Sequence, residues 1–116
     1  VREEYPNIII MADCATFEEG VAAHAAGADL VGTTMNGYTP QTAGETGEPN
    51  FALVARLVKT LPCPVIAEGR IHTPEQARKM LEIGAWAVVV GGAITRPLEI
   101  ASRFMAAVHD LPGGMV

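Results

Sequence analysis

Short runs of apolar residues alternate with longer amphipathic segments along this chain. The short runs cover residues 7–12, 29–33, 64–67 and 86–90. Runs of this length with few polar interruptions are typical of strands that are buried on both faces of a parallel sheet. Between the second and third runs, apolar residues recur at helical spacing, at positions 51, 53, 54, 57 and 58. The pattern predicts four strands, each followed by a helix, with the helices over residues 17–26, 50–61, 73–84 and 97–109.

A repeat marks the ends of two of these helices. The stretch that begins with Thr16 and ends with Gly27 recurs 57 residues later, between Thr73 and Gly84. In both copies the threonine is expected to cap a helix, with the acidic or amide residue three positions later reaching back to it. The glycine supplies the left-handed residue that ends a helix. Two strand–helix units span one repeat, so the chain holds four units.

Alternating strands and helices predict an α/β fold with a parallel sheet and right-handed crossovers. Four units are half of a TIM (β/α)8 barrel, and we expect residues 1–116 to form one such half. A doubly wound sheet is the alternative, although its phosphate-binding glycines more often follow the first strand. Residues 34–49 are polar and glycine-rich, which predicts a functional loop. Residues 110–116 are expected to be a frayed tail.

Composition narrows the range of partners. The net charge is −5 and the isoelectric point is near 5.0, which argues against nucleic acid and anionic membranes. A bound phosphate would therefore be held locally, by backbone N–H groups and a few arginines. No apolar run approaches the roughly 18 residues that a membrane helix needs. Cys14 and Cys63 lie beside apolar strand residues, which favours reduced, buried thiols, and we expect a cytoplasmic protein.

Glycines follow the last two predicted strands. Gly69 comes just after the third strand, and Gly91 and Gly92 come just after the fourth. In a (β/α)8 barrel, the loops after the last two strands and a short helix N-terminus form the usual phosphate site. Glycines let backbone N–H groups approach a phosphate closely. We therefore predict that these three glycines bind a phosphate, although each could also be a plain turn glycine.

Two carboxylates stand at predicted strand ends. Glu68 directly follows the third strand and Asp13 follows the first. Alternate strands of a barrel contribute side chains to the same interior layer, so both carboxylates are expected to face one cavity. The alternatives are that Asp13 only caps its loop and that Glu68 only pairs with Arg70. A carboxylate between an apolar strand and a glycine favours a chemical role for Glu68.

Other polar residues are candidates for binding. Arg96 lies at a helix start, where a cation is unfavourable, and its planar guanidinium suits a phosphate or an acyl carbonyl. Arg70 would bind the ligand or hold Glu68. Thr33 belongs to a loop rich in hydroxyls and glycine, residues 32–39, that is suited to gripping a sugar, or is simply a solvated loop. No spacing of histidines suggests a metal site.

Taken together, these strand ends resemble the N-acetylmannosamine-6-phosphate 2-epimerase family of bacterial sialic acid breakdown. The similar stretches are ADCAT (12–16), VGTTMNGYT (31–39), VIAEGRI (65–71) and VVVGGAITRP (88–97). They occur in order over nearly the whole chain. The family often has serine in place of Ala15 and Leu-Ser in place of Met35-Asn36, and neither change touches the candidate acid or the glycines.

The resemblance implies a TIM-barrel isomerase that inverts C2 of N-acetylmannosamine 6-phosphate to give N-acetylglucosamine 6-phosphate, without a metal or an organic cofactor. By position, Glu68 would be an acid/base residue. Substrate would be bound by Asp13 and Arg96, and we expect Thr33 and Arg70 to bind it as well. The backbone at the three glycines would take the phosphate.

One departure from the family matters. Inversion needs two groups flanking C2, and family members use a lysine beside the glutamate. This chain has only Lys59 and Lys79, both within predicted helices. The resemblance places the chain in the C-terminal half of the barrel, strands five to eight, whereas the lysine belongs to the other half. We therefore expect an inactive fragment that self-associates or joins a missing N-terminal half; a different phosphate-binding barrel enzyme, or a half-barrel module without chemistry, is the alternative.

Overall fold

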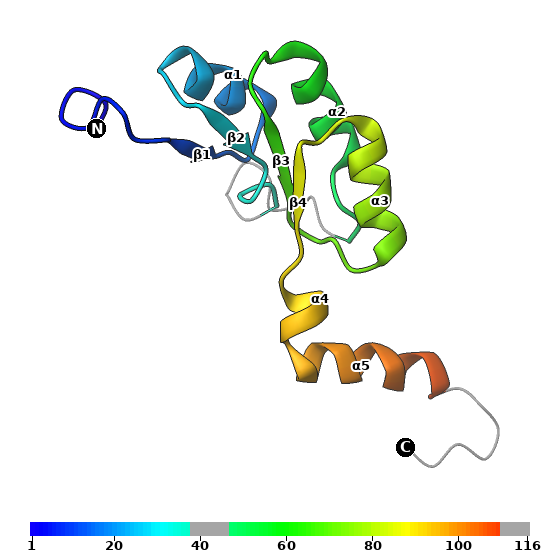
Figure 1. Ribbon diagram of the computed structural model, residues 1–116. Helices are drawn as coiled ribbons and strands as arrows, with labels where there is room; N and C mark the ends of the chain where they lie inside the picture. Colours follow the sequence, from blue (N-terminus) through cyan, green and yellow to red (C-terminus); the bar gives the residue numbers. More distant parts are fainter. Residues whose placement is uncertain (38–46, 110–116) are drawn as a thin grey trace.

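A four-stranded parallel sheet organises the computed structural model, which describes residues 1–37 and 47–109 (Figure 1). Its strands are β1 (Met11–Asp13), β2 (Leu30–Gly32), β3 (Val65–Glu68) and β4 (Ala87–Val89). Their spatial order is β1-β2-β3-β4, so each strand lies beside the one before it in the sequence. In a doubly wound sheet the spatial order of the strands reverses at a switch point. The strand order of the described sheet has no such reversal, which excludes the doubly wound alternative and matches the wall of a barrel.

Three helices follow the first three strands and lie on one face of this sheet (Figure 1). They are α1 (Phe17–Ala25), α2 (Phe51–Thr60) and α3 (Pro74–Ile83). After β4 come a one-turn helix, α4 (Gly92–Thr95), and α5 (Pro97–Val108), which extend away from the sheet. The sequence pattern predicted α5 but did not locate α4. None of the described helices is long and apolar enough to cross a membrane.

The predicted helix ends are confirmed. The Thr16 hydroxyl accepts from the Glu19 N–H at 3.2 Å, and the Glu19 carboxylate accepts from the Thr16 N–H at 3.1 Å. The same reciprocal bonds join Thr73 and Gln76 at 3.1 and 3.2 Å. Each box satisfies N–H groups that the first helical turn leaves without partners. The repeat seen in the sequence is therefore a repeat of helix starts.

The core lies between the sheet and its helices. Its most deeply buried large side chains are Val31, Val54, Leu57, Val65 and Met80. Helix α1 approaches α2 closely because Gly20 has no side chain: a Cβ there would lie 2.7 Å from Leu57 Cδ2. This packing leaves the strand C-terminal ends open for the loops that carry chemistry.

No described helix covers the opposite face of the sheet, which we call the bare face. One expectation about the strands is therefore wrong. The first run was expected to be a strand covered on both faces, yet only Met11–Asp13 pairs, and Ile9 is 74% and Met11 41% exposed. At the far edge Val89 is 40% exposed. Strand alternation and register put Met11, Leu30, Ile66 and Val89 on this face, and of these only Ile66, in the middle of the sheet, is buried, at 6% exposed. In a closed barrel this face of the sheet is the interior. Its apolar side chains would then be covered by other strands, which the described residues do not include.

The described residues stop short of two predicted features. Residues 110–116, expected as a frayed tail, and residues 38–46 of the expected functional loop lie outside the described ranges. The N-terminal residues are tied down by Arg2, which is 2.7 Å from the Asp29 carboxylate. The hydrogen bond from Arg2, with a second from the Ile10 N–H, lowers the pKa of Asp29.

The C-terminal glycine of α3 provides a test of this packing. Gly27 and Gly84 both have φ near +110° to +120°, but only Gly84 has a neighbour, Val58 Cγ1, 2.8 Å from where a Cβ would stand. We expect Gly27→Ala to lower the free energy of unfolding by about 1 kcal/mol through backbone strain alone. Gly84→Ala should lose about 1 to 3 kcal/mol more through overpacking. Urea denaturation measures both, and adding Val58→Ala to Gly84→Ala should recover the difference; equal losses for the two glycine variants would contradict the packing.

Candidate active site

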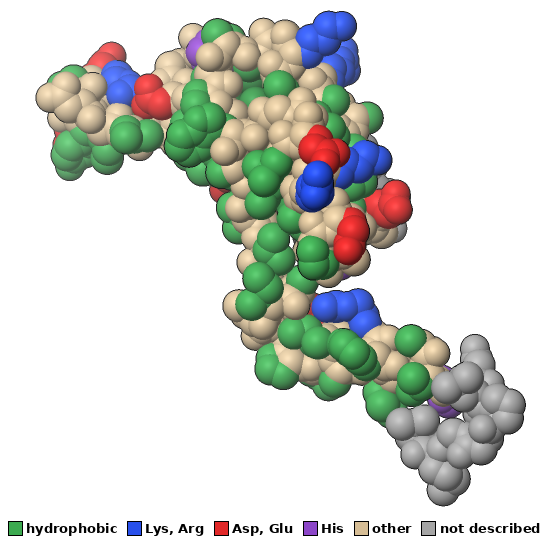
Figure 2. Space-filling model, turned by 45° about the vertical axis from the view of Figure 1, so that its right-hand side comes forward, with side chains coloured by type: hydrophobic (Ala, Val, Ile, Leu, Met, Phe, Trp, Pro, Cys, Tyr) green, Lys and Arg blue, Asp and Glu red, His purple; other side chains and the backbone are tan. Residues whose placement is uncertain are grey.

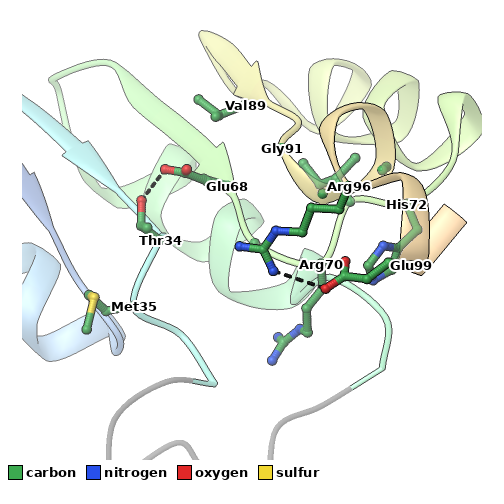
Figure 3. Close-up of a pocket in the computed structure, with 13 residues that line it drawn as sticks. Thr34, Met35, Glu68, Arg70, His72, Val89, Gly91, Arg96 and Glu99 are labelled. Atoms are coloured by element: carbon green, nitrogen blue, oxygen red, sulfur yellow. Dashed lines mark hydrogen bonds and ion pairs between the residues drawn. The ribbon is translucent and has the colours of Figure 1, made fainter.

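A cavity of about 350 Å³ opens at the C-terminal ends of β3 and β4 (Figure 3). Its walls come from the loop after β2, the loop after β3, the turn into α4 and the start of α5. The lining residues are Thr34, Met35, Glu68, Gly69, Arg70, Ile71, His72, Val89, Gly91, Gly92, Ala93, Arg96 and Glu99. Parallel strands bring their carboxyl ends to one edge, which is where α/β barrels place their chemistry.

Glu68 is the last residue of β3 and lines this cavity. Its backbone is held on both sides by one hydroxyl: Thr33 Oγ1 accepts from the Glu68 N–H at 3.1 Å and donates to the Glu68 carbonyl at 3.0 Å. Its carboxylate makes a short hydrogen bond with the Thr34 hydroxyl (Figure 3). Consecutive threonines thus hold the main chain and the side chain of the same glutamate.

Arg70 does not form the ion pair with Glu68 that was the simplest alternative. Its guanidinium instead donates to Asn36 Oδ1 at 2.8 Å, and the Asn36 amide donates to the Ala15 carbonyl at 2.8 Å. Asn36 is only 4% exposed. This chain of bonds links the loops after β1, β2 and β3. Arg70 lines the cavity with a backbone φ of +59°, which is uncommon for a residue with a side chain.

Asp13 does not line this cavity but is joined to it. It ends β1 on the same bare face as Glu68, and its Oδ1 lies 3.2 Å from the Thr34 hydroxyl oxygen. Its partner in register is Gly32, where an added Cβ would lie 2.5 Å from Met11 Cε and 3.4 Å from Asp13 Oδ1. The absence of a side chain at Gly32 therefore leaves room for the Met11 side chain, while Asp13 Oδ1 is at ordinary contact distance. One hydroxyl therefore contacts both candidate carboxylates.

The three glycines lie around the same cavity. Gly69 has φ of +106° with no close neighbour, so its conformation, rather than lack of space, favours glycine there. Gly91 caps α4, and the helix closes with the Ile94 N–H donating to the Gly91 carbonyl at 2.9 Å. The first N–H groups of a helix have no partner inside it, which leaves those of Gly92 and Ala93 available beside the cavity.

Arg96 also lines the cavity, between α4 and α5. Its guanidinium is 3.0 Å from the Glu99 carboxylate, and both side chains are largely exposed (Figure 3). Sequence reasoning missed Glu99 and His72 as lining residues. The position of Glu99 three residues after Arg96, in the first turn of a helix, is the signal that could have found it.

Thr33 lies behind Glu68. It is 3% exposed and its hydroxyl bonds to the Glu68 backbone, and its expected contact with substrate stays a prediction. No group of three His, Cys, Asp or Glu side chains suited to a metal occurs in the part of the chain that the structure describes.

The comparisons with known proteins agree with one another. The family described as "Putative N-acetylmannosamine-6-phosphate epimerase" matches residues 1–110. Two relatives named "Putative N-acetylmannosamine-6-phosphate 2-epimerase", from Caldanaerobacter subterraneus and Listeria welshimeri, are each 50% identical, over 110 and 106 residues. The solved structure of the Clostridium perfringens 2-epimerase is 47% identical with a TM-score of 0.84. A thiamine phosphate pyrophosphorylase from Pyrococcus furiosus, 24% identical with a TM-score of 0.65, shares the fold.

The chain spans about half the length of the curated relatives it matches. The match covers 95% of this chain but 46% of the Caldanaerobacter protein, and 90% of this chain but 45% of the Listeria protein. It covers 90% of this chain and 45% of the Clostridium structure. With these neighbours, the fold is about four βα units of a TIM barrel, as the sequence predicted.

Cys14 provides a test of the environment beside Asp13. Burial, and secondarily the charges of Glu19 and Asp13, raise the pKa of its thiol. A raised pKa lowers the thiolate fraction at pH 7, so we expect Cys14 to react with a disulfide reagent at least about tenfold more slowly than the less buried Cys63. Cys63→Ser should leave only the slow phase, and both thiols should react alike in urea. A fast reaction in Cys63→Ser would contradict the burial of Cys14.

Proposed function

This chain belongs to the N-acetylmannosamine-6-phosphate epimerase family, and we propose that it supplies the C-terminal half of an isomerase. The proposed reaction interconverts N-acetylmannosamine 6-phosphate and N-acetylglucosamine 6-phosphate. The observation that carries the proposal is a single cavity lined by Glu68 and by the glycine turns after β3 and β4. The proposed acid/base residue and the proposed phosphate site therefore border one cavity.

The phosphate is proposed to lie against Gly69, Gly91 and Gly92. All three glycines line the cavity, and Arg96 lines it as well. The chain carries a net charge of −5, so local donors must offset general repulsion of an anion. Arg96 would then exchange its bond with Glu99 for a planar contact with the phosphate or the acyl group, and Arg70 would border the sugar.

Glu68 is proposed as one of two acid/base residues. When the sugar ring opens, C1 becomes an aldehyde and the hydrogen on C2 becomes acidic. One group removes this proton, the electron pair passes into the enolate, and a proton returns to the opposite face, so nothing is oxidised or reduced. Glu68 ends β3 with its carboxylate at the cavity, where it can carry one of these protons. Asp13 is proposed to bind substrate from β1, and Thr33 to hold the backbone of Glu68.

The second acid/base group is proposed to lie outside this chain. Lys59 is at the C-terminal end of α2, six residues before β3 starts, and therefore near the opposite edge of the sheet. Lys79 lies in the helix layer, with its ammonium 4.2 Å from the centre of the Phe51 ring. The sheet separates this layer from the bare face on which Glu68 lies. Neither lysine can reach the cavity.

The bare face of the sheet and the length of the relatives point to the same partner. The chain covers less than half of the relatives it matches, while an apolar sheet face and the edges of β1 and β4 are open among the described residues. We propose that the other four βα units of the barrel cover this face, and that isolated chains self-associate through it. Helix α5 also exposes apolar residues, among them Leu98 and Phe104, and Figure 2 shows hydrophobic side chains along this helix. Two free cysteines are compatible with a cytoplasmic enzyme.

We expect the isolated chain to self-associate and show no epimerase turnover. Combining it with the N-terminal half of the Clostridium perfringens relative should give a one-to-one complex with turnover, because the second acid/base group is then present. Val89→Asp on the bare face should prevent assembly, whereas Leu81→Asp, at an exposed position on α3, should not. Light scattering and an epimerase assay measure these outcomes. Robust turnover by the chain alone would overturn the proposal of a half barrel.

In the assembled barrel, Glu68→Gln should lower kcat by about 100- to 10,000-fold, the usual contribution of a positioned acid/base group. KM should change little, because the amide keeps the size of the side chain and the phosphate contacts are elsewhere. Exchange of the C2 hydrogen with deuterated solvent, followed by NMR, measures the loss directly. Glu75→Gln, on the exposed first turn of α3, is the matched control and should leave kcat unchanged. Full activity in Glu68→Gln would favour a different reaction.

A further inference from the structure

The Thr34 hydroxyl is the one group among the described residues that contacts both candidate carboxylates. It makes a short hydrogen bond with Glu68 Oε2 and lies 3.2 Å from Asp13 Oδ1. The register that pairs Gly32 with Ile66, continued by two residues, puts Thr34 opposite Glu68 on the bare face. Sequence reasoning had assigned Thr34 only to a loop.

A hydroxyl has one proton to donate and lone pairs with which to accept. It therefore cannot donate to two ionised carboxylates at once. When Glu68 is ionised, Thr34 can donate to Glu68. When Glu68 carries a proton, Glu68 can donate to Thr34, and Thr34 can turn its own proton to Asp13. The hydroxyl keeps one proton in both arrangements, and Glu68 keeps a hydrogen bond in both.

We infer that Thr34 is a positioning residue that holds the Glu68 carboxyl in place in both of its protonation states, with Asp13 as the alternative acceptor. The inference rests on the proposed function, because an acid/base residue must pass through both states in every turnover. Asp13 thereby gains a role through Thr34 in addition to any contact with substrate. The adjacent Thr33 fixes the Glu68 backbone, so the remaining freedom is rotation of the side chain, which Thr34 limits.

The test compares Thr34→Val, which removes the hydroxyl at nearly constant size, with Thr34→Ser, which retains it. In the assembled barrel, Thr34→Val should lower kcat by about 10- to 100-fold, the value of a hydrogen bond to a charged group. KM should stay within about threefold, because the phosphate contacts lie elsewhere, and Thr34→Ser should recover most of kcat. Thr60→Val makes the same chemical change at the exposed end of α2 and should have no effect.

A second comparison separates positioning from direct contact with substrate. If Thr34 acts through Glu68, adding Thr34→Val to Glu68→Gln should cost less than about twofold more, since coupled residues are not additive. The inference would be overturned if the losses in kcat of the two single variants multiplied in the double variant, or if Thr34→Ser failed to restore kcat. If the assembled barrel has no turnover at all, the proposed function fails by itself.

NMR of the chain then tests the role of Thr34 independently. Three-bond couplings should show a single Glu68 side-chain rotamer in the unmodified chain and in Thr34→Ser, and averaging over several rotamers in Thr34→Val, because the hydroxyl that limits its rotation is gone. An unchanged Glu68 rotamer in Thr34→Val would also overturn the inference. This measurement needs no substrate and no second half of the barrel.

Discussion

Parallel pairing of β2, β3 and β4 is the constraint on which the rest of the structure depends. The register of these strands puts Gly32 beside Ile66 and Glu68 beside Val89. It also sends every loop that carries a candidate residue out from the same edge of the sheet. A one-residue slip of β3 would turn Glu68 toward the helices and move Ala67 to the bare face. The position of the carboxylate is therefore set by the same bonds that form the sheet.

The turns around the cavity depend on this register in a second way. Where the backbone hydrogen bonds between β2 and β3 end, the Thr33 hydroxyl bonds both the N–H and the carbonyl of Glu68. The next residue along the chain then lies opposite the Glu68 side chain. Two hydroxyls in sequence thus serve two different purposes because strand geometry alternates their directions. This alternation explains why Thr33 is buried while Thr34 lines the cavity.

Local signals in the sequence were sufficient for most of the fold. Capping boxes at Thr16 and Thr73 depend on residues three positions apart, so they could be predicted without any tertiary information. The apolar runs located the strands but overstated the first one, since Ile9 has no partner strand among the described residues. Helix α4 could not be placed because four residues carry too little periodicity.

The site was harder to predict than the fold because its contacts join distant residues. The positions of Glu68 and the glycines at strand ends predicted that they share one cavity, because parallel strands all end at the same edge of the sheet. It could not show which threonine faces the cavity, because the choice depends on where β2 ends. It also could not foresee that Arg70 would bond with Asn36, 34 residues away, instead of with its near neighbour Glu68.

The stereochemistry of the proposed reaction gives an independent reason to expect half a barrel to be insufficient. Inversion at a carbon requires one group on each face of it, and the sheet of this chain can approach a substrate from only one side. Glu68, Thr34 and Asp13 lie on that side together, with the glycine turns beside them. A second proton-transferring group must come from across the bare face, where a barrel places its remaining strands. The open apolar face and the single proposed acid/base residue are therefore both accounted for by one proposal, in which the other strands of a barrel cover the face and supply the second group.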